Sequence, residues 1–415
     1  MSASPPNLLD ALRAAVAFEP LGAPAGNLTL GKGRLDGRPL RVAIVENRIA
    51  SGSIGKAEVA KLVPLLSIVA REKAPLVVWL DSAGARVSEG LEALGAFRRL
   101  FREALAARVA GAPLAMVLGR NCFGGASMLA HLAPRRLFSP NTQLAMSGPA
   151  ILASAAGADA LDEMFRAIAQ ASIGAQAREK ASSANRAWEP GMDVAAWLRE
   201  ALAPGAGSFD AFHERHQSLR DRLGKGLTAR QPEAMRRKEL ERLFPEGYQA
   251  LECDGVVTGE ARRDGAPVPL LGLVGTTPVG AERAWRFAQA AWRLAIQSPA
   301  RLEVLLDCET HAPRLEDEKA VLTEYIVDMG VALASLAARG THVELTILDR
   351  AGGGVYVALA AAATRVAVVF GADIQVLPGA AVASILGANR DAVGDPAEYR
   401  AAGVADVELK LGLPP

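Results

Sequence analysis

Two short glycine runs stand at matching places in the two halves of this 415-residue chain. Gly124-Gly125 follows the apolar run at 114–118, and Gly352-Gly353-Gly354 follows the apolar run at 345–348. Each run opens an alanine-rich segment that is typical of a helix. A Gly-Gly turn at the start of a helix leaves backbone N–H groups unpaired, where the helix dipole favours negative charge. Two such turns in register predict a duplicated oxyanion-binding device.

Further landmarks around the glycine runs support a duplication. A glycine before a helix, an aspartate that closes a strand, and a second turn recur at separations that agree within two residues. With the glycine runs, these landmarks are Gly55, Asp81, Gly125 and Ser147 in the first half and Gly280, Asp307, Gly353 and Leu377 in the second. Repeats of this length indicate two copies of one domain and exclude a solenoid, whose period is much shorter.

The segments around these landmarks alternate between strand and helix patterns, which predicts an α/β layer architecture with right-handed crossovers. In the first half we expect strands at 40–47, 75–81, 113–119, 135–140 and 142–147, and helices at 56–71, 90–110 and 125–132. In the second half we expect strands at 269–275, 302–307, 343–349, 364–371 and 372–378.

The length alone predicts two or three domains. Residues 1–40 are interpreted as an N-terminal extension with a short amphipathic helix at 8–18, and residues 41–180 as the first domain. Residues 181–255 are charged and broken by proline and glycine, which indicates a partly helical connector. Residues 256–415 form the second domain.

Composition excludes several classes of function. A formal net charge of +1 argues against nucleic acid as a partner. Three cysteines without a CxxC pair indicate a reducing, cytoplasmic location and no zinc site. The N-terminus lacks a secretory pattern, and Arg365, Asp373 and Pro378 interrupt the apolar stretch at 355–386, so no membrane span is expected.

The stretch DSAGARVSEG at 81–90 resembles the carboxyltransferase subunits of biotin-dependent acyl-coenzyme A carboxylases, with Ala83 in place of a glycine. The second half is similar to the gamma subunit of biotin-independent malonate decarboxylase, in LLGLVGTTPVGAERA at 270–284 and in the AGGG turn at 351–354. The SGP at 147–149 is typical of the beta subunit of that enzyme. The chain therefore resembles a beta–gamma fusion over roughly residues 40–180 and 256–390.

This resemblance implies two tandem crotonase-like domains, each a ββα superhelix, with an active site between them and often across a dimer interface. A homodimer or higher homo-oligomer is therefore expected. The implied reaction is that of a carboxy-lyase, which decarboxylates a malonyl thioester, on acyl carrier protein or coenzyme A, to the acetyl thioester and CO2 without a cofactor or metal.

Decarboxylation leaves an enolate, and each backbone N–H that stabilises its oxygen lowers the barrier by about 3–4 kcal/mol. The N–H groups of Gly125 and Ala126 are expected to hold the thioester oxygen, and those of Gly353 and Gly354 the departing carboxylate, although the two sets could be exchanged. The residues expected to line the substrate are Gly124, Gly148, Gly352, Ser82 and Arg86.

A proton donor must then quench the enolate. Ser147 and Tyr356 are the donors we expect, and Cys122, His131 and His311 also lie near the motifs. Each has a structural alternative: buried cysteines act as small hydrophobes, a core histidine is normally hydrogen-bonded, and a serine before Gly-Pro can cap a helix.

One departure from the family pattern keeps other functions open. The segment Cys308–His311 lacks the glycine that usually follows the second-half aspartate in malonate decarboxylases. A biotin-dependent carboxyltransferase, which would use biotin through separate partner proteins, is the first alternative. A non-catalytic subunit that binds acyl thioesters or carrier proteins is the second.

Overall fold

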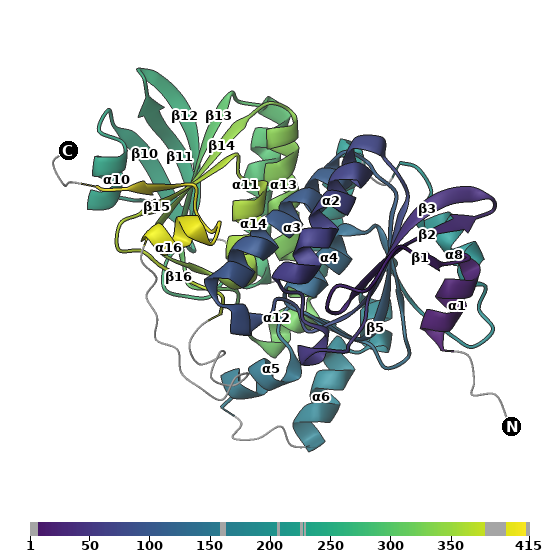
Figure 1. Cartoon of the computed structure of the whole chain (residues 1–415). Helices are drawn as coiled ribbons and strands as arrows, with labels where there is room; N and C mark the ends of the chain where they lie inside the picture. The colour runs from purple at the N-terminus through teal and green to yellow at the C-terminus, as the bar shows by residue number, and fades with distance from the viewer. Residues whose placement is uncertain are drawn as a thin grey trace, which may run out of the picture. The chain divides into compact units, whose positions relative to one another are not determined.

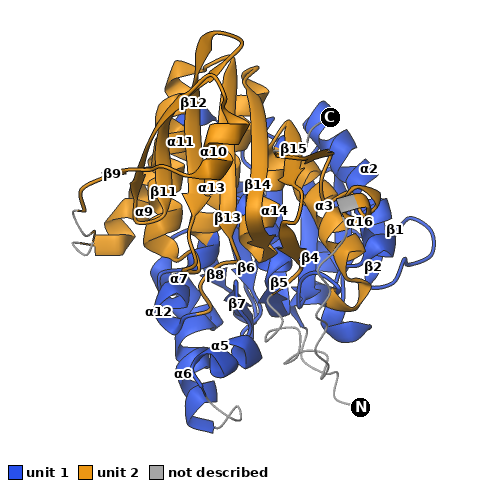
Figure 2. Cartoon of the chain, turned by 90° about the vertical axis from the view of Figure 1, so that its left-hand side faces the viewer, with its two compact units in different colours: residues 1–86, 106–211, 314–323 blue, residues 87–105, 212–313, 324–415 orange. Residues whose placement is uncertain are grey.

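The computed structural model describes residues 7–157, 163–205, 208–224, 227, 230–377 and 396–411 (Figure 1). The chain divides into two compact units, coloured separately in Figure 2. Unit 1 consists of residues 1–86, 106–211 and 314–323, and unit 2 of residues 87–105, 212–313 and 324–415. Each unit is therefore assembled from separate stretches of the chain.

Unit 1 is built on one mixed sheet with the strand order β1-β2-β3-β4-β5-β6-β8, in which β7 also pairs with β5. Strands β1, β2 and β3 are antiparallel, and the pairs from β3 to β8 are parallel. The strands are β1 Glu19–Pro20, β2 Leu28–Leu35, β3 Arg38–Val45, β4 Leu76–Ser82, β5 Leu114–Phe123, β6 Arg135–Phe138, β7 Gln143–Ala145 and β8 Asn185–Ala187.

Unit 2 repeats this arrangement, with the order β17-β15-β14-β13-β12-β11-β10-β9 and β16 paired with β14. Strands β9 to β12 are antiparallel, and the remaining pairs are parallel. The strands are β9 Glu233–Ala234, β10 Tyr248–Cys253, β11 Val256–Arg263, β12 Ala266–Val274, β13 Arg301–Cys308, β14 His342–Gly352, β15 Arg365–Val369, β16 Asp373–Gln375 and β17 Val407–Leu409.

The two sheets match strand for strand from β2–β8 to β11–β17, which confirms the expected α/β class and the expected duplication. In each unit a 17-residue helix joins the first two parallel strands: α2 Lys56–Glu72 and α11 Ala281–Gln297. The predicted landmarks Gly55 and Gly280 are the N-cap residues of these helices.

The hairpins that open each sheet were not predicted, although a local signal exists. Asp-Gly dipeptides at 36–37, 254–255 and 264–265 join β2 to β3, β10 to β11 and β11 to β12. Both residues of each dipeptide have positive φ, which is the type I′ geometry that Asp-Gly favours in two-residue hairpins. Strands β1 and β2 thus lie within the stretch interpreted as an extension, and β8 and β10 within the stretch interpreted as a connector.

Helices cover the sheets through their apolar faces. In unit 1, Leu8 and Leu12 of α1 (Leu8–Ala15) and Trp197 of α8 (Val194–Ala201) pack with Val42 and Ile44 of β3, and both helices lie beside β1–β3 in Figure 1. In unit 2, α10 (Lys238–Leu243) packs similarly on the second sheet. Other helices are α3 Leu91–Val109, α4 Gly125–Leu132, α5 Pro149–Ala155, α6 Glu163–Ile173, α7 Ala175–Ala181, α9 Phe209–Leu223, α12 Leu315–Lys319, α13 Leu322–Ala338, α14 Gly353–Ala362 and α16 Pro396–Ala401.

Candidate functional site

The first glycine turn lies in unit 1, between β5 and α4. Gly124 has φ 52° and ψ −128°, a conformation open to glycine, and its N–H donates to the Met146 carbonyl at 3.1 Å. Its own carbonyl accepts the Met128 N–H at 3.1 Å. The next two N–H groups, on Gly125 and Ala126, meet no acceptor among the described residues. The turn thus presents two adjacent donors at the positive end of α4.

The loop after β4 keeps the space beside this turn open. Gly84 has φ 97°, and a Cβ there would lie 2.7 Å from the Phe123 carbonyl oxygen and 3.2 Å from the Gly125 nitrogen. Any larger residue at 84 would therefore press on the peptide that carries a free donor. The Gly84 N–H donates to the hydroxyl of buried Ser82 at 3.1 Å, so Ser82 holds this loop in place.

Arg86 forms an ion pair with Glu58, a fully buried carboxylate at the start of α2. Glu58 also accepts the N–H groups of Asn27 and Gly55, each at 2.9 Å. Burial raises the pKa of Glu58, but the Asn27 amide and the Arg86 guanidinium outweigh burial and hold it below its ordinary value. The Arg86 guanidinium therefore anchors the loop that carries Gly84, and its contact with substrate stays a prediction.

The second turn of unit 1 follows β7. Ser147 is fully buried, and its N–H donates to Glu318 Oε1 at 2.7 Å. The N-cap of the following helix α5 is Gly148, and not Ser147 as the alternative interpretation proposed. A Cβ at Gly148 would stand 3.4 Å from the Phe123 ring, the last residue of β5 before the glycine turn.

The second glycine turn lies in unit 2, where β14 enters α14. Gly353 has φ 54°, and the N–H groups of Gly353 and Gly354 meet no acceptor among the described residues. A Cβ at Gly353 would lie 2.6 Å from Thr310 Oγ1 and 3.5 Å from His311 Nδ1. The structure therefore brings Thr310 and His311 against this turn.

Thr310 and His311 are both buried, and Thr310 Oγ1 lies 3.1 Å from His311 Nδ1. Burial lowers the pKa of His311 to about 4, so the imidazole is neutral at neutral pH. Sequence reasoning named His311 only as one of several donors and did not name Thr310. The sequence did hold a signal for them: Thr310 lies two residues after β13, as Gly84 lies two residues after β4, so both positions should face a glycine turn.

Strand pairing corrects the register between the two turns by one residue. Phe123 pairs with Ala145 in unit 1, and Gly352 pairs with Gln375 in unit 2. Gly124 therefore corresponds to Gly353, and both have positive φ, whereas the spacing had matched Gly125 to Gly353.

The same comparison shows where the two turns differ. Ala85 bridges Ile54 in unit 1, and His311 bridges Val279 in unit 2, so Gly84 corresponds to Thr310. Beside the first turn, Gly84 has no side chain and leaves space. Beside the second turn, the corresponding place holds the hydroxyl of Thr310 and the imidazole of His311.

The strand-closing aspartates act as structural acceptors in each unit. Asp81 accepts the Asn121 N–H at 3.0 Å, which ties β4 to β5. Asp307 accepts from the Arg237 guanidinium at 2.8 Å and so joins β13 to the segment before α10. Both contacts support the alternative that these residues hold neighbouring segments instead of taking part in the chemistry.

The other predicted proton donors have structural partners. The Tyr356 hydroxyl is buried and donates to the Val404 carbonyl, and burial raises its pKa above the ordinary value. Burial likewise raises the pKa of Cys122, and it raises that of Cys308 to about 12, so both are thiols. His131 is a core residue whose Nδ1 lies 2.7 Å from the Ser127 carbonyl oxygen.

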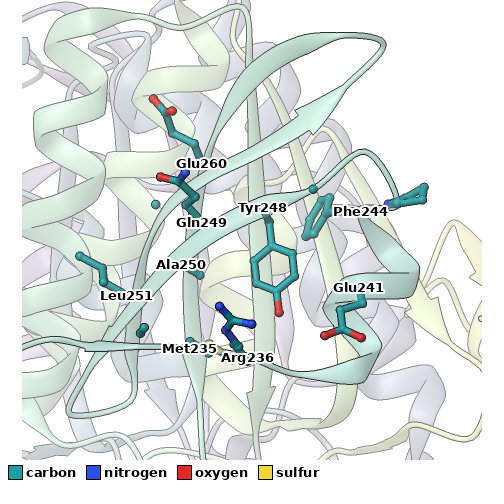
Figure 3. A pocket seen from close by; sticks show the side chains of 13 residues that line it. Met235, Arg236, Glu241, Phe244, Tyr248, Gln249, Ala250, Leu251 and Glu260 are labelled. Atoms are coloured by element: carbon teal, nitrogen blue, oxygen red, sulfur yellow. The ribbon is translucent and has the colours of Figure 1, made fainter.

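Unit 2 also contains a pocket of about 660 Å³ that none of the predicted site residues lines (Figure 3). Phe244, Tyr248 and Met235 line it together with charged Arg236 and Glu241 (Figure 3). The pocket lies among β9, α10, β10 and β11, and none of its lining residues belongs to either glycine turn.

In the described part of the chain, no cluster of three or more His, Cys, Asp or Glu residues could hold a metal ion. None of the helices described is both long enough and apolar enough to cross a membrane.

Comparisons with known proteins give a family match along nearly the whole chain. The family model described as "Carboxyl transferase domain" matches residues 8–412. The 12S subunit of methylmalonyl-CoA carboxyltransferase from Propionibacterium freudenreichii is 27% identical over 36% of this chain and 29% of its own length. The beta5 subunit of a biotin-dependent acetyl-/propionyl-coenzyme A carboxylase from Mycobacterium leprae is 24% identical over 80% of this chain and 63% of its own length.

The chain therefore spans less than two thirds of the length of these curated relatives. Among solved structures, a chain of a Pseudomonas malonate decarboxylase hetero-tetramer in complex with malonate is 23% identical, with a TM-score of 0.45. This match covers 55% of the present chain and 92% of the Pseudomonas chain.

Proposed function

Because the chain belongs to the carboxyl transferase domain family, we propose that it decarboxylates a malonyl thioester to the acetyl thioester and CO2 without biotin. The substrate is malonyl-acyl carrier protein or malonyl-coenzyme A. The observation that carries the proposal is the first glycine turn, with its two unpaired N–H groups and the space that Gly84 leaves beside them.

The chemistry assigns these donors to the thioester oxygen. When the bond between Cα and the carboxylate breaks, its electron pair moves into the thioester, and negative charge develops on the carbonyl oxygen. The Gly125 and Ala126 N–H groups stabilise that charge without reorganising, because the turn already directs them outward. CO2 leaves, a proton supplied by water adds to Cα, and the acetyl thioester is released.

The second turn supports decarboxylation over carboxyl transfer in one respect. We assign Gly353 and Gly354 to the departing carboxylate, whose charge disappears as CO2 forms. A full cation beside it would stabilise the reactant more than the transition state and slow the reaction. The side chains against Gly353 are a hydroxyl and a histidine whose pKa of about 4 leaves it uncharged. We therefore assign Thr310 and His311, and not Tyr356, as the polar side chains beside the substrate at this turn.

Carboxyl transfer with biotin is the second candidate function, because relatives named as biotin-dependent carboxylases match up to four fifths of this chain. That reaction uses the same enolate and the same donors in unit 1.

The favoured proposal also includes a beta–gamma fusion and a homo-oligomer. Light scattering after gel filtration measures the oligomeric state.

The test incubates the purified protein with malonyl-coenzyme A and with malonyl-carrier protein, without biotin or ATP, and follows the acetyl product by mass spectrometry. A parallel reaction adds biotin and measures carboxybiotin. Acetyl product without biotin is expected. If the biotin-free reaction gives no acetyl product and the reaction with biotin gives carboxybiotin, carboxyl transfer replaces decarboxylation as the function. If the protein binds the thioester and neither product forms, it is a non-catalytic subunit.

The matched pair Gly84→Ala and Gly340→Ala tests the site. Both glycines have nearly the same φ, 97° and 95°, but only Gly84 has neighbours that a Cβ would strike. Since loss of one oxyanion donor typically costs 10²–10³ in kcat, we expect Gly84→Ala to lower kcat about 100-fold. Gly340→Ala should leave kcat within about threefold; equal effects of the two substitutions would reject the site assignment.

A further inference from the structure

The segment 314–323 follows Thr310 and His311 in the chain but belongs to unit 1. Two of its side chains, Glu318 and Thr323, are buried and hydrogen-bond to residues around the first glycine turn. Neither side chain belongs to a motif of the family resemblance. Their contacts converge on one residue, Gly124, whose backbone sets the direction of the Gly125 N–H.

Thr323 acts on the carbonyl side of Gly124. Ser127 Oγ donates to the Gly124 carbonyl at 2.7 Å and lies 3.1 Å from Thr323 Oγ1. A serine hydroxyl has one hydrogen, and here that hydrogen is used on Gly124. Thr323 must therefore be the donor in its contact with Ser127, which polarises the Ser127 hydroxyl and holds its rotamer.

This contact matters for the free donor because of peptide geometry. The Gly124 carbonyl and the Gly125 N–H belong to one planar trans peptide, so they point in opposite directions. A hydrogen bond that fixes the carbonyl therefore fixes the N–H as well. The Met128 N–H and the Ser127 hydroxyl both hold this carbonyl.

Glu318 acts on the N–H side of Gly124. Its carboxylate accepts the Ser147 N–H at 2.7 Å and the Met146 N–H, and the Met146 carbonyl in turn accepts the Gly124 N–H at 3.1 Å. Burial raises the pKa of Glu318 to about 7, while the Arg178 guanidinium, 3.2 Å away, opposes that rise. Arg178 also donates to the carbonyl of Leu144 in β7, the strand that precedes Met146 and Ser147.

We propose that Glu318 and Thr323 are positioning residues that fix the two peptides on either side of Gly124, and with them the direction of the enolate-binding Gly125 N–H. This inference rests on the proposed function for its catalytic consequence but not for its structural content. The segment that carries these two residues follows β13 of unit 2 in the chain, yet it belongs to unit 1 together with the turn that it holds.

The test uses Thr323→Val, which keeps shape but removes the hydroxyl, with Thr323→Ser to restore it. Ser335→Ala is the matched control, because Ser335 is another buried hydroxyl of α13, and its hydrogen-bond partner among the described residues is the Val331 carbonyl of the same helix. We expect Thr323→Val to lower kcat for malonyl-coenzyme A about tenfold with KM within twofold. Thr323→Ser and Ser335→Ala should stay within twofold of wild type in both constants.

A readout independent of activity separates this inference from the proposed function. In protein labelled with [15N]glycine, the Gly125 amide signal is identified by its loss in Gly125→Ala. Thr323→Val should shift this signal and speed its hydrogen exchange, and Thr323→Ser should not. An inactive wild type would reject the proposed function while this measurement still decides the positioning. A Gly125 signal unmoved by Thr323→Val would overturn the inference, as would unchanged kcat in an active enzyme.

Discussion

The substitution Gly353→Ala tests most directly whether the second turn is built as described. An L-residue held at φ 54° costs about 1–2 kcal/mol relative to glycine. The new Cβ would stand 2.6 Å from Thr310 Oγ1, so Thr310 must rotate and give up its 3.1 Å contact with His311. Losing a buried hydrogen bond adds about 1–3 kcal/mol. We therefore expect a loss of about 3 kcal/mol in the free energy of unfolding.

Two companion variants divide this cost into its parts. Gly90 has φ 59°, and apart from its chain neighbours no atom of the described residues lies within 4 Å of the place that an alanine methyl group would occupy there. Gly90→Ala should therefore carry the backbone cost alone, about 1–2 kcal/mol. In the Thr310→Ala background the collision disappears, and Gly353→Ala should cost about as much as Gly90→Ala. The double-mutant cycle should therefore give a coupling of about 1–2 kcal/mol between positions 310 and 353.

Urea unfolding followed by far-UV circular dichroism measures these four free energies, and kcat for the malonyl thioester is measured in parallel. If Gly353→Ala costs no more than Gly90→Ala, or costs the same whether or not Thr310 is present, then Thr310 does not lie against this turn. The assignment of His311 to the turn would fail with it.

Three further outcomes follow from the buried groups. The folded-state pKa of His311 is about 4, below the ordinary 6.5, so its neutral form stabilises the fold above pH 6.5. About 3 kcal/mol of the free energy of unfolding should be lost as the pH falls from 6.5 through 4. Urea unfolding measured across this range should show the loss in the wild type and not in His311→Asn. Cys253 alone should react with a thiol reagent in the native protein, as counted by mass spectrometry, while Cys308 with its pKa of about 12 and Cys122 react only after unfolding. Tyr356→Phe should cost about 1 kcal/mol of stability and leave kcat within threefold; a 100-fold loss of kcat would restore Tyr356 as the proton donor.

Much of the fold could be read from local patterns. The expected strands of both halves are present within a few residues, and the expected helices begin where glycine or a polar residue precedes an apolar period. The paired turns also lie where predicted, between a buried strand and an alanine-rich helix. These features depend on neighbours in the sequence, because strand alternation, helical period and turn geometry are set over a few residues.

The site was only partly predictable, because its details depend on atoms that meet after folding. Spacing misaligned the two turns by one residue, since the helical connection from β4 to β5 is shorter than the one from β13 to β14. The choice of Tyr356 as proton donor depended on its nearness to Gly354 in sequence, yet helix α14 carries its hydroxyl to Val404. Position along a chain does not fix the direction of a helical side chain relative to the neighbouring segments.

The sequence by itself determined the duplication, the α/β class and the two glycine turns. Only the tertiary structure decided what faces each turn: Gly84 beside the first, and Thr310 with His311 against the second. It also brought Glu318 to Ser147 and Thr323 to Ser127, across 171 and 196 residues of sequence. A buried carboxylate or hydroxyl must find a partner wherever packing provides one, and no local pattern records a partner that distant.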